Sequence, residues 1–174
     1  MEGDVEMESA EYEKFVIDVL FDVCNNLYLQ WGILIFIDTV DAKYYGRGVN
    51  GELVAGSFIP PNNQYSPEPV IVMFPKGCIK VIQLVAESNK KCNHMNPKHV
   101  GKICMHLLKH EYRHFQQWFW LDKNGFSDLW IKLVQLSNYW HDPLEDDANR
   151  SAAGNCDDID DVMASVLTEA KSVF

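Results

Sequence analysis

Residues 97–118, PKHVGKICMHLLKHEYRHFQQW, are the stretch of the sequence that decides the fold. Their apolar residues recur every three or four positions, which predicts one long amphipathic helix. Pro97 suits the first turn of that helix, where a backbone amide hydrogen is not needed. His110 and His114 are four residues apart, so their side chains point to the same face. Two imidazoles placed in this way can bind one zinc ion.

Glu111 adds a second chemical group to this helix. It is rotated by about 100° from His110, so it can reach a water on the metal without ligating the metal itself. Zinc lowers the pKa of such a water toward neutrality, and a carboxylate beside it can take the proton and later return it to a leaving amine. The His-Glu-x-x-His spacing therefore predicts a metallopeptidase site. The alternative is a pair of surface histidines on an amphipathic helix.

A catalytic zinc also needs a third protein ligand and an open fourth position. His106 is about 12 Å of helix rise from His114, too far for one ion to bind both, so we expect it to be packed or to support a ligand. A histidine six residues after His114 would indicate a metzincin, but Trp120 occupies that position and excludes the class. The remaining candidate is Glu145.

The segment HEYRHFQQ, residues 110–117, resembles the active helix of small gluzincin-type metallopeptidases, many of which are encoded by phages and mobile elements. Their helix typically reads HELRH followed by an aromatic residue and a glutamine, and their second motif reads P-x-E-x-x-A-D-x-x-A. The residues here that match the second motif are Pro143, Glu145, Ala148 and Ala152. The resemblance covers residues 99–153. It implies that Glu145 is the third zinc ligand and that a sheet edge receives an extended peptide as an added strand.

One position departs from this pattern, because Asn149 stands where the family has aspartate. In the wider group that aspartate often orients a zinc-bound histidine through a hydrogen bond. Asn149 can still accept such a bond, without charge, and Asp146 or Asp147 could replace it. Arg113 matches the family's arginine and is expected either to pair with an acid of the later helix or to be a solvated surface residue.

The rest of the chain predicts an α+β fold with an N-terminal helix, a small three-stranded sheet and a helical half. A helical apolar period covers residues 9–29. Predicted strands are 31–40, 52–59 and 70–74, the last being the expected edge strand. The apolar residues of the segment 76–87 fit both the two-residue period of a strand and the period of a helix, and we favour a helix. Further helices are expected from residue 127, over 143–153 and over 157–171. We expect residues 1–8 to be a flexible acidic tail and residues 9–174 to form a single zincin-like metallopeptidase domain.

The composition of the chain argues against some classes of binding partner. The net charge is −10, and the acids gather in residues 2–13 and 142–161. This balance argues against binding a nucleic-acid backbone or an anionic membrane surface. The chain opens with acids rather than a signal peptide, and no apolar run reaches the ~18 residues of a membrane span. Its 5 cysteines are scattered without a CxxC pair, so we expect free thiols and a cytoplasmic location.

These observations give one main hypothesis and three alternatives. The main one is a zinc metallopeptidase of the cytoplasm in which His110, His114 and Glu145 bind Zn²⁺. Glu111 is its general base and then its general acid, and its substrate is a peptide or protein. The alternatives are a catalytically degenerate relative that binds a protein partner as inhibitor or regulator, a metal-free acidic interaction protein, and a hydrolase of non-peptide amides.

Other residues have weaker roles in this hypothesis. Tyr139 and His141 precede the second motif and could stabilise an oxyanion, although a helix-end aromatic and a solvated histidine are the favoured explanation. His94 and His99 are candidates for a second metal. The aromatic residues Trp118, Phe119, Trp120, Trp130 and Trp140 are expected mainly in the core, although Trp120 or Trp140 could line a substrate pocket.

Overall fold

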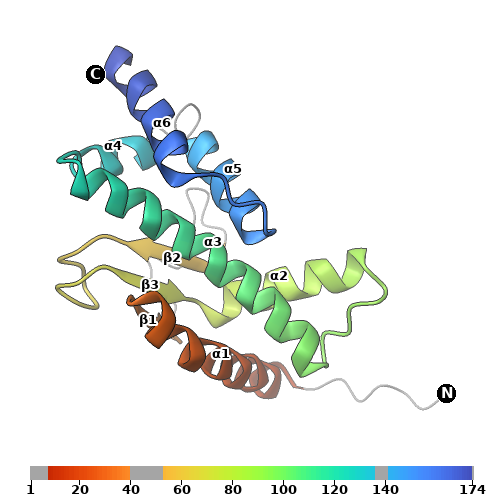
Figure 1. Ribbon diagram of the computed structural model, residues 1–174. Coiled ribbons are helices and arrows are strands. Elements are labelled where there is room, and N and C mark those ends of the chain that lie inside the picture. The colour runs from red at the N-terminus through yellow and green to blue at the C-terminus, as the bar shows by residue number, and fades with distance from the viewer. Residues whose placement is uncertain (1–7, 40–52, 136–140, 174) are drawn as a thin grey trace. The chain divides into compact units, whose positions relative to one another are not determined.

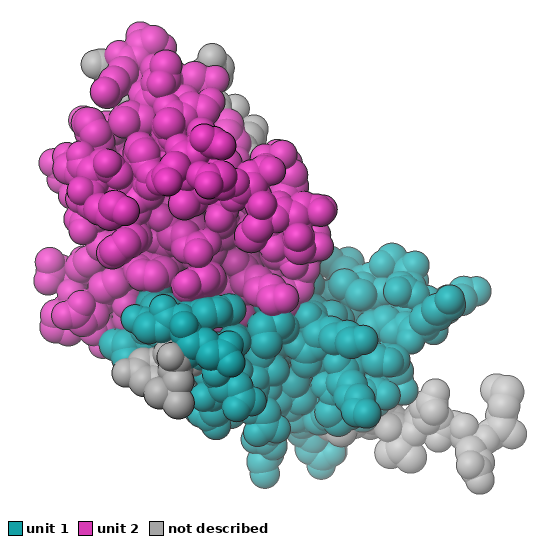
Figure 2. All heavy atoms as spheres, in the orientation of Figure 1, with its two compact units in different colours: residues 1–57, 72–105 teal, residues 58–71, 106–174 magenta. Residues whose placement is uncertain are grey.

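The computed structural model describes residues 8–39, 53–135 and 141–173. Contacts divide the chain into two compact units (Figure 2), each described here by itself. The first unit is Met1–Ser57 with Val72–Met105, and the second is Phe58–Ile71 with His106–Phe174. Helix α3 (Pro97–Lys123) belongs in part to each unit. A single domain over residues 9–174 stays a prediction, and residues 1–7 of the expected tail lie outside the described residues.

The first unit begins with helix α1 (Ser9–Trp31), which confirms the helix expected at residues 9–29 (Figure 1). Its buried side includes Val16, Leu20 and Leu27. Through this side α1 packs against strand β1 (Leu34–Ile37) and helix α2 (Pro75–Ser88). Gly32 follows the helix with a positive φ of 66°, a conformation typical of the residue that ends a helix. This turn explains why the strand begins at Leu34 rather than at residue 31.

The sheet has three strands in the order β1-β3-β2, where β2 is Gly56–Ile59 and β3 is Val70–Met73. At the strand ends the Asp38 N–H donates to the Met73 carbonyl, and the Phe74 N–H donates to the Ala55 carbonyl, each at 2.9 Å. The sheet is therefore mixed, with β3 parallel to β1 and antiparallel to β2. The expectation that β3 is an edge strand was wrong. All four residues of β3 are buried, as its unbroken apolar sequence fits for a central strand.

Helix α2 settles the ambiguous segment at residues 76–87 in favour of a helix. Pro75 occupies its first turn, while Cys78 and Ile82 are buried one turn apart. Gly77 also lies against the chain before β2, where an added Cβ would be 2.0 Å from the Val54 carbonyl oxygen. Only glycine permits this close approach, so the start of α2 is fixed beside residues 54–55.

The second unit contains the later part of α3 with three further helices: α4 (Leu129–Gln135), α5 (His141–Ala152) and α6 (Ile159–Val173). Helices α4 and α5 contact each other. Fully buried residues of this unit are Leu108, Leu121, Leu133, Leu144 and Met163. The helices expected over residues 143–153 and 157–171 are thereby confirmed within two residues at each end, as is the α+β fold.

Among the described residues, no helix combines the length and the apolar composition needed to cross a bilayer. All 5 cysteines have free thiols, and three of them, Cys24, Cys78 and Cys104, are buried in the first unit. Burial raises the pKa of the Cys24 thiol to about 11, so this group is a protonated, inert part of the core.

The glycine at position 77 gives a direct test of the first unit. Gly77→Ala should lower the free energy of unfolding by about 1–3 kcal/mol, because a backbone carbonyl cannot move away from the added methyl. The matched control is Gly101→Ala in α3, where the new Cβ would make ordinary contacts with the side chains of Val19 at 3.8 Å and Val23 at 3.9 Å. That change should be neutral or stabilise by up to about 1 kcal/mol. Urea unfolding measures the free energy of unfolding of both variants. An equal loss of stability in the two would contradict the close approach of Gly77 to the Val54 carbonyl.

Candidate metal centre

Three donor atoms from two helices converge in the second unit. The Nε2 atoms of His110 and His114 are 3.1 Å apart. Glu145 brings one oxygen to within 3.0 Å of His110 Nε2 and the other to within 2.9 Å of His114 Nε2. Among the described residues, these three form the group of side chains that could hold a metal ion. The structure therefore brings together the three residues that the sequence predicted as ligands.

Local folding explains this convergence. The two histidines are one turn apart on α3, and their rings meet edge to face at 4.8 Å between centroids. On α5 the residues Leu144, Ala148 and Ala152 are buried at four-residue spacing and form its inner face. Glu145, next to Leu144, lies at the border of that face, where its carboxylate reaches the histidines.

The spacing of the donor atoms fits a metal ion. Tetrahedral coordination with bonds of about 2 Å places neighbouring ligand atoms roughly 3.3 Å apart. The two Nε2 atoms are 3.1 Å apart, and each lies 2.9–3.0 Å from a different oxygen of Glu145. With one ligand atom taken from each residue, all three lie within 4.8 Å of one another. Two imidazoles and one carboxylate also form a donor set that zinc accepts in proteins. The residues present thus fit a tetrahedral ion with one position left for a small molecule.

Glu111 lies beside this group without joining it. Its Oε2 accepts a hydrogen bond from the Phe58 N–H at 2.9 Å, and its Oε1 is 3.9 Å from His110 Nε2. Burial raises the pKa of Glu111, and the nearby Glu145 carboxylate raises it further, while His114, His110 and the Phe58 N–H act in the opposite direction. Glu111 therefore lies close to the group of His110, His114 and Glu145 without belonging to it, and its role toward a metal-bound water stays a prediction.

Aromatic side chains surround the histidine pair with apolar surface. The Phe58 ring lies 5.6 Å from the Trp130 ring and 5.9 Å from the Trp118 ring, measured between centroids. Trp130 also meets the His114 ring edge to face at 6.0 Å. Both tryptophans are buried, as expected, but Phe119 is half exposed, so the expectation of a core position was wrong for that residue. This wall excludes water from one side of His114 and strengthens the electrostatic interactions made there.

Burial disfavours the charged form of His114, but its hydrogen bond to Glu145 and the carboxylates of Glu111 and Glu145 outweigh that effect and raise its pKa to about 9. The pKa of the Glu145 carboxyl is shifted in the opposite direction. Although burial acts to raise its pKa, the hydrogen bonds from His110 and His114 hold that pKa far below its usual range. A metal ion binding here must therefore displace a proton from His114.

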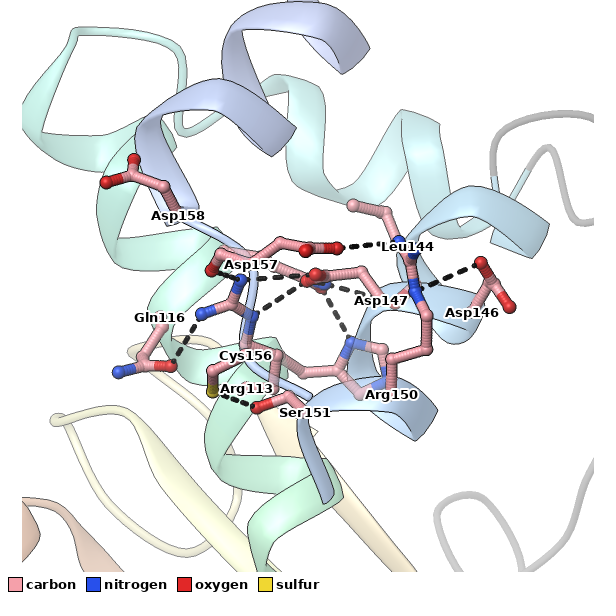
Figure 3. Close-up of polar contacts among 12 residues, drawn as sticks. Arg113, Gln116, Leu144, Asp146, Asp147, Arg150, Ser151, Cys156, Asp157 and Asp158 are labelled. Atoms are coloured by element: carbon pink, nitrogen blue, oxygen red, sulfur yellow. Dashed lines mark hydrogen bonds and ion pairs between the residues drawn. The ribbon is translucent and has the colours of Figure 1, made fainter. Parts of the chain in front are cut away.

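Arg113 and Asp147 form a buried ion pair between α3 and α5. The guanidinium donates through Nε to Asp147 Oδ2 at 2.8 Å and through Nη2 to Asp147 Oδ1 at 3.1 Å. Nη2 also donates to the Asp157 carbonyl at 2.7 Å, in the connection between α5 and α6 (Figure 3). The expected pairing of Arg113 with an acid of the later helix is confirmed, and the alternative of a solvated surface arginine is wrong.

The residue that supports His114 was missed from the sequence. His114 Nδ1 is 2.8 Å from Gln117 Oε1, one turn further along α3. Gln117 in turn donates to Asp147 Oδ2 at 2.8 Å. Asn149, at the family's aspartate position, is exposed, and so is Asp146. The available signal was the three-residue spacing of His114 and Gln117, which places both on one helix face.

Several other candidates lie elsewhere. His106 is exposed, so the expectation that it is packed was wrong, because one more turn of α3 carries it about 6 Å along the axis from His110. In the first unit, His99 Nδ1 accepts the Asn93 N–H at 2.8 Å. Neither His94 nor His99 belongs to a metal-binding group in the described part of the chain. Tyr139 and the side chain of His141 lie outside the described residues.

Comparison of this chain with protein-family models, curated proteins and solved structures returns no match. The resemblance seen in residues 99–153 therefore stays a prediction. What supports a metal centre is the geometry of His110, His114 and Glu145 in this chain alone.

The raised pKa of His114 predicts how metal affinity depends on pH. A proton competes with the metal for His114 at every pH below about 9, so the association constant for zinc should rise about tenfold per unit between pH 7 and 9. Above about pH 9 it should level off. An ordinary histidine, with a pKa of 6.5, would give a plateau already from about pH 7. Titration in chelator-buffered zinc distinguishes the two, and a flat response from pH 7 to 9 would exclude this coupling.

The Arg113–Asp147 pair predicts a large loss of stability. Arg113→Met leaves the Asp147 carboxylate buried without its partner, which should lower the free energy of unfolding by about 3–5 kcal/mol. Arg150→Met is the matched control, because Arg150 forms half-exposed pairs with Asp146 and Asp157. Its loss should amount to about 1 kcal/mol or less. Similar midpoints in urea for the two variants would refute the assignment of Arg113 as the buried anchor of α5.

Proposed function

We propose that this chain is a zinc-dependent metallopeptidase. The observation that carries the proposal is the convergence of His110, His114 and Glu145 around one point, with the Glu111 carboxylate on the same side of α3. Two histidines and an acid supply three protein ligands and leave a fourth position, which is the composition of a catalytic rather than a structural zinc site. Structural sites more often use four protein ligands, and no cysteine belongs to this group.

Zinc is favoured over other ions by the donor set. Calcium and magnesium prefer six or more oxygen ligands, whereas this group offers two nitrogens and one carboxylate. Imidazole and carboxylate together suit zinc in tetrahedral geometry, and zinc brings no redox chemistry to the site.

A zinc ion held there would supply Lewis acidity and lower the pKa of water at its open position to about 7. Glu111 is the residue suited to the proton transfers. The Phe58 N–H holds Glu111 Oε2, which leaves Oε1 as the atom that takes the proton. Burial raises the pKa of Glu111, which favours proton uptake by its carboxylate and a later return of that proton to the leaving amine.

The position of β2 supports a peptide as the substrate. Among the strands of the described residues β2 lies at one edge of the sheet, and Phe58 within it contacts Glu111 directly. A peptide that adds to a sheet edge is held in extended form by main-chain hydrogen bonds. An extended chain along β2 would carry its amide carbonyls past Glu111 and the three ligands. In this proposal β2 takes the role that the sequence had suggested for β3.

Zinc content tests the ligand set. Protein purified without chelator or affinity-tag metal should contain about one zinc per chain, and Glu145→Ala should lose it, because two neutral histidines alone bind weakly. Asp146→Ala is the matched control, since this neighbouring acid is exposed and should leave the zinc in place. Elemental analysis gives the answer. Absence of zinc from the parent protein, even after zinc is added back, would end the metallopeptidase proposal.

Glu111→Gln tests the chemistry separately from the metal. The amide keeps the size of the side chain but cannot accept the proton, so hydrolysis of a peptide library should fall by about 100-fold or more while zinc content is unchanged. Mass spectrometry of the digested library measures the rate. Bound zinc without any peptide cleavage by the parent protein would instead favour a protein that keeps the metal as structural support and acts by binding a partner.

A further inference from the structure

We propose that Gln117 is a positioning residue that fixes the proton of His114 on Nδ1 and so directs the Nε2 lone pair to the metal position. Asp147 and Arg113 in turn fix the orientation of the Gln117 amide. The proposal deepens the metal site and rests on the proposed function for its effect on zinc, but the hydrogen-bond arrangement itself is a property of the folded chain.

The first argument comes from burial. The buried polar or charged residues of the described chain are Arg113, His114, Gln117 and Asp147. All four belong to a single series of hydrogen bonds that ends at His114. Burying polar groups is costly unless every donor and acceptor finds a partner. The buried polar groups of the described residues thus gather in one series. Because this series ends on Nδ1 of His114, we infer that it orients the ring of this candidate ligand.

The second argument fixes the direction of each bond. Gln117 Nε2 lies 3.0 Å from the Leu144 carbonyl oxygen and 2.8 Å from Asp147 Oδ2. Both of these oxygens are acceptors, so the atom facing them must be the amide nitrogen with its two hydrogens. The amide oxygen consequently faces His114 Nδ1 at 2.8 Å, and the bond exists only if Nδ1 carries the hydrogen. Neutral His114 then has its lone pair on Nε2, the atom directed at His110 and Glu145.

The third argument concerns charge. Arg113 binds both oxygens of Asp147 and also the Asp157 carbonyl, so the carboxylate is neutralised and held in place (Figure 3). On its Nδ1 side, His114 therefore meets a neutral amide rather than a carboxylate. This arrangement orients the ring without adding negative charge next to it.

The variant that tests this role is Gln117→Met, which keeps the length of the side chain and removes its hydrogen bonds. Zinc should bind 10–100-fold more weakly, the range seen when the outer partner of a zinc-bound histidine is lost. The matched control is Gln116→Met, because Gln116 contacts only Arg113, at 3.4 Å, among the residues of the series. Its zinc affinity should stay within about twofold of the parent, and thermal unfolding of both variants without metal monitors folding.

A second readout observes the proton on His114 Nδ1 directly and does not depend on measuring zinc affinity. Nitrogen-15 NMR of histidine-labelled protein should show a slowly exchanging Nδ1–H for His114, both without metal and with zinc, because this proton is buried and hydrogen-bonded. The signal should persist in Gln116→Met and vanish in Gln117→Met. Absence of the Nδ1–H signal from the parent protein, or coordination of zinc through Nδ1, would overturn the proposal even if Gln117→Met fails to fold.

The two proposals fail in different ways. If the parent protein binds no zinc but keeps the protected Nδ1–H, the metallopeptidase proposal falls and the positioning of His114 stands. If zinc binds and Gln117→Met, correctly folded, retains the parent's affinity, the positioning role is wrong and the metal site stands.

Discussion

The buried pair of Arg113 and Asp147 is the interaction on which the candidate site depends. Arg113 precedes His114 on α3, and Asp147 follows Glu145 by two residues on α5. The two hydrogen bonds between Arg113 and Asp147 fix how α3 and α5 are aligned along each other. This alignment sets the distance between the Glu145 carboxylate and both histidines. Buried ion pairs add little net stability because desolvation offsets attraction. We therefore interpret this pair as specifying one arrangement of α3 and α5, at the expense of a more stable apolar contact.

The metal position and the stability of the second unit are consequently linked. Without metal, the raised pKa of His114 and the lowered pKa of Glu145 describe a proton held between them, which stabilises the fold as a metal ion would. This contribution of His114 is complete below pH 6.5 and is lost as pH rises through about 9. A metal would replace the proton and keep the three side chains together at higher pH. Phe58 adds Glu111 to the same arrangement through a main-chain bond.

Much of this could be predicted from the sequence because it follows from short-range periodicity. The spacing of His110 and His114 fixed their shared face, and apolar repeats located each helix to within a few residues. Sheet order was not predictable in the same way, because four apolar residues in β3 show burial but not which strands lie beside it. The role of Gln117 also escaped, since it depends on α5 bringing Asp147 and the Leu144 carbonyl to the amide. Contacts between segments that are distant in the sequence produce no pattern among neighbouring residues from which they could be predicted.

The most direct test of the central claim is a crystal structure of the zinc-loaded protein, with anomalous scattering recorded at the zinc edge. The account predicts one peak per chain, about 2.0–2.2 Å from the Nε2 atoms of His110 and His114 and from a Glu145 oxygen, with one further position open. It also predicts that Glu111 remains outside the coordination sphere. A peak at another set of side chains, or none between α3 and α5, would contradict the account.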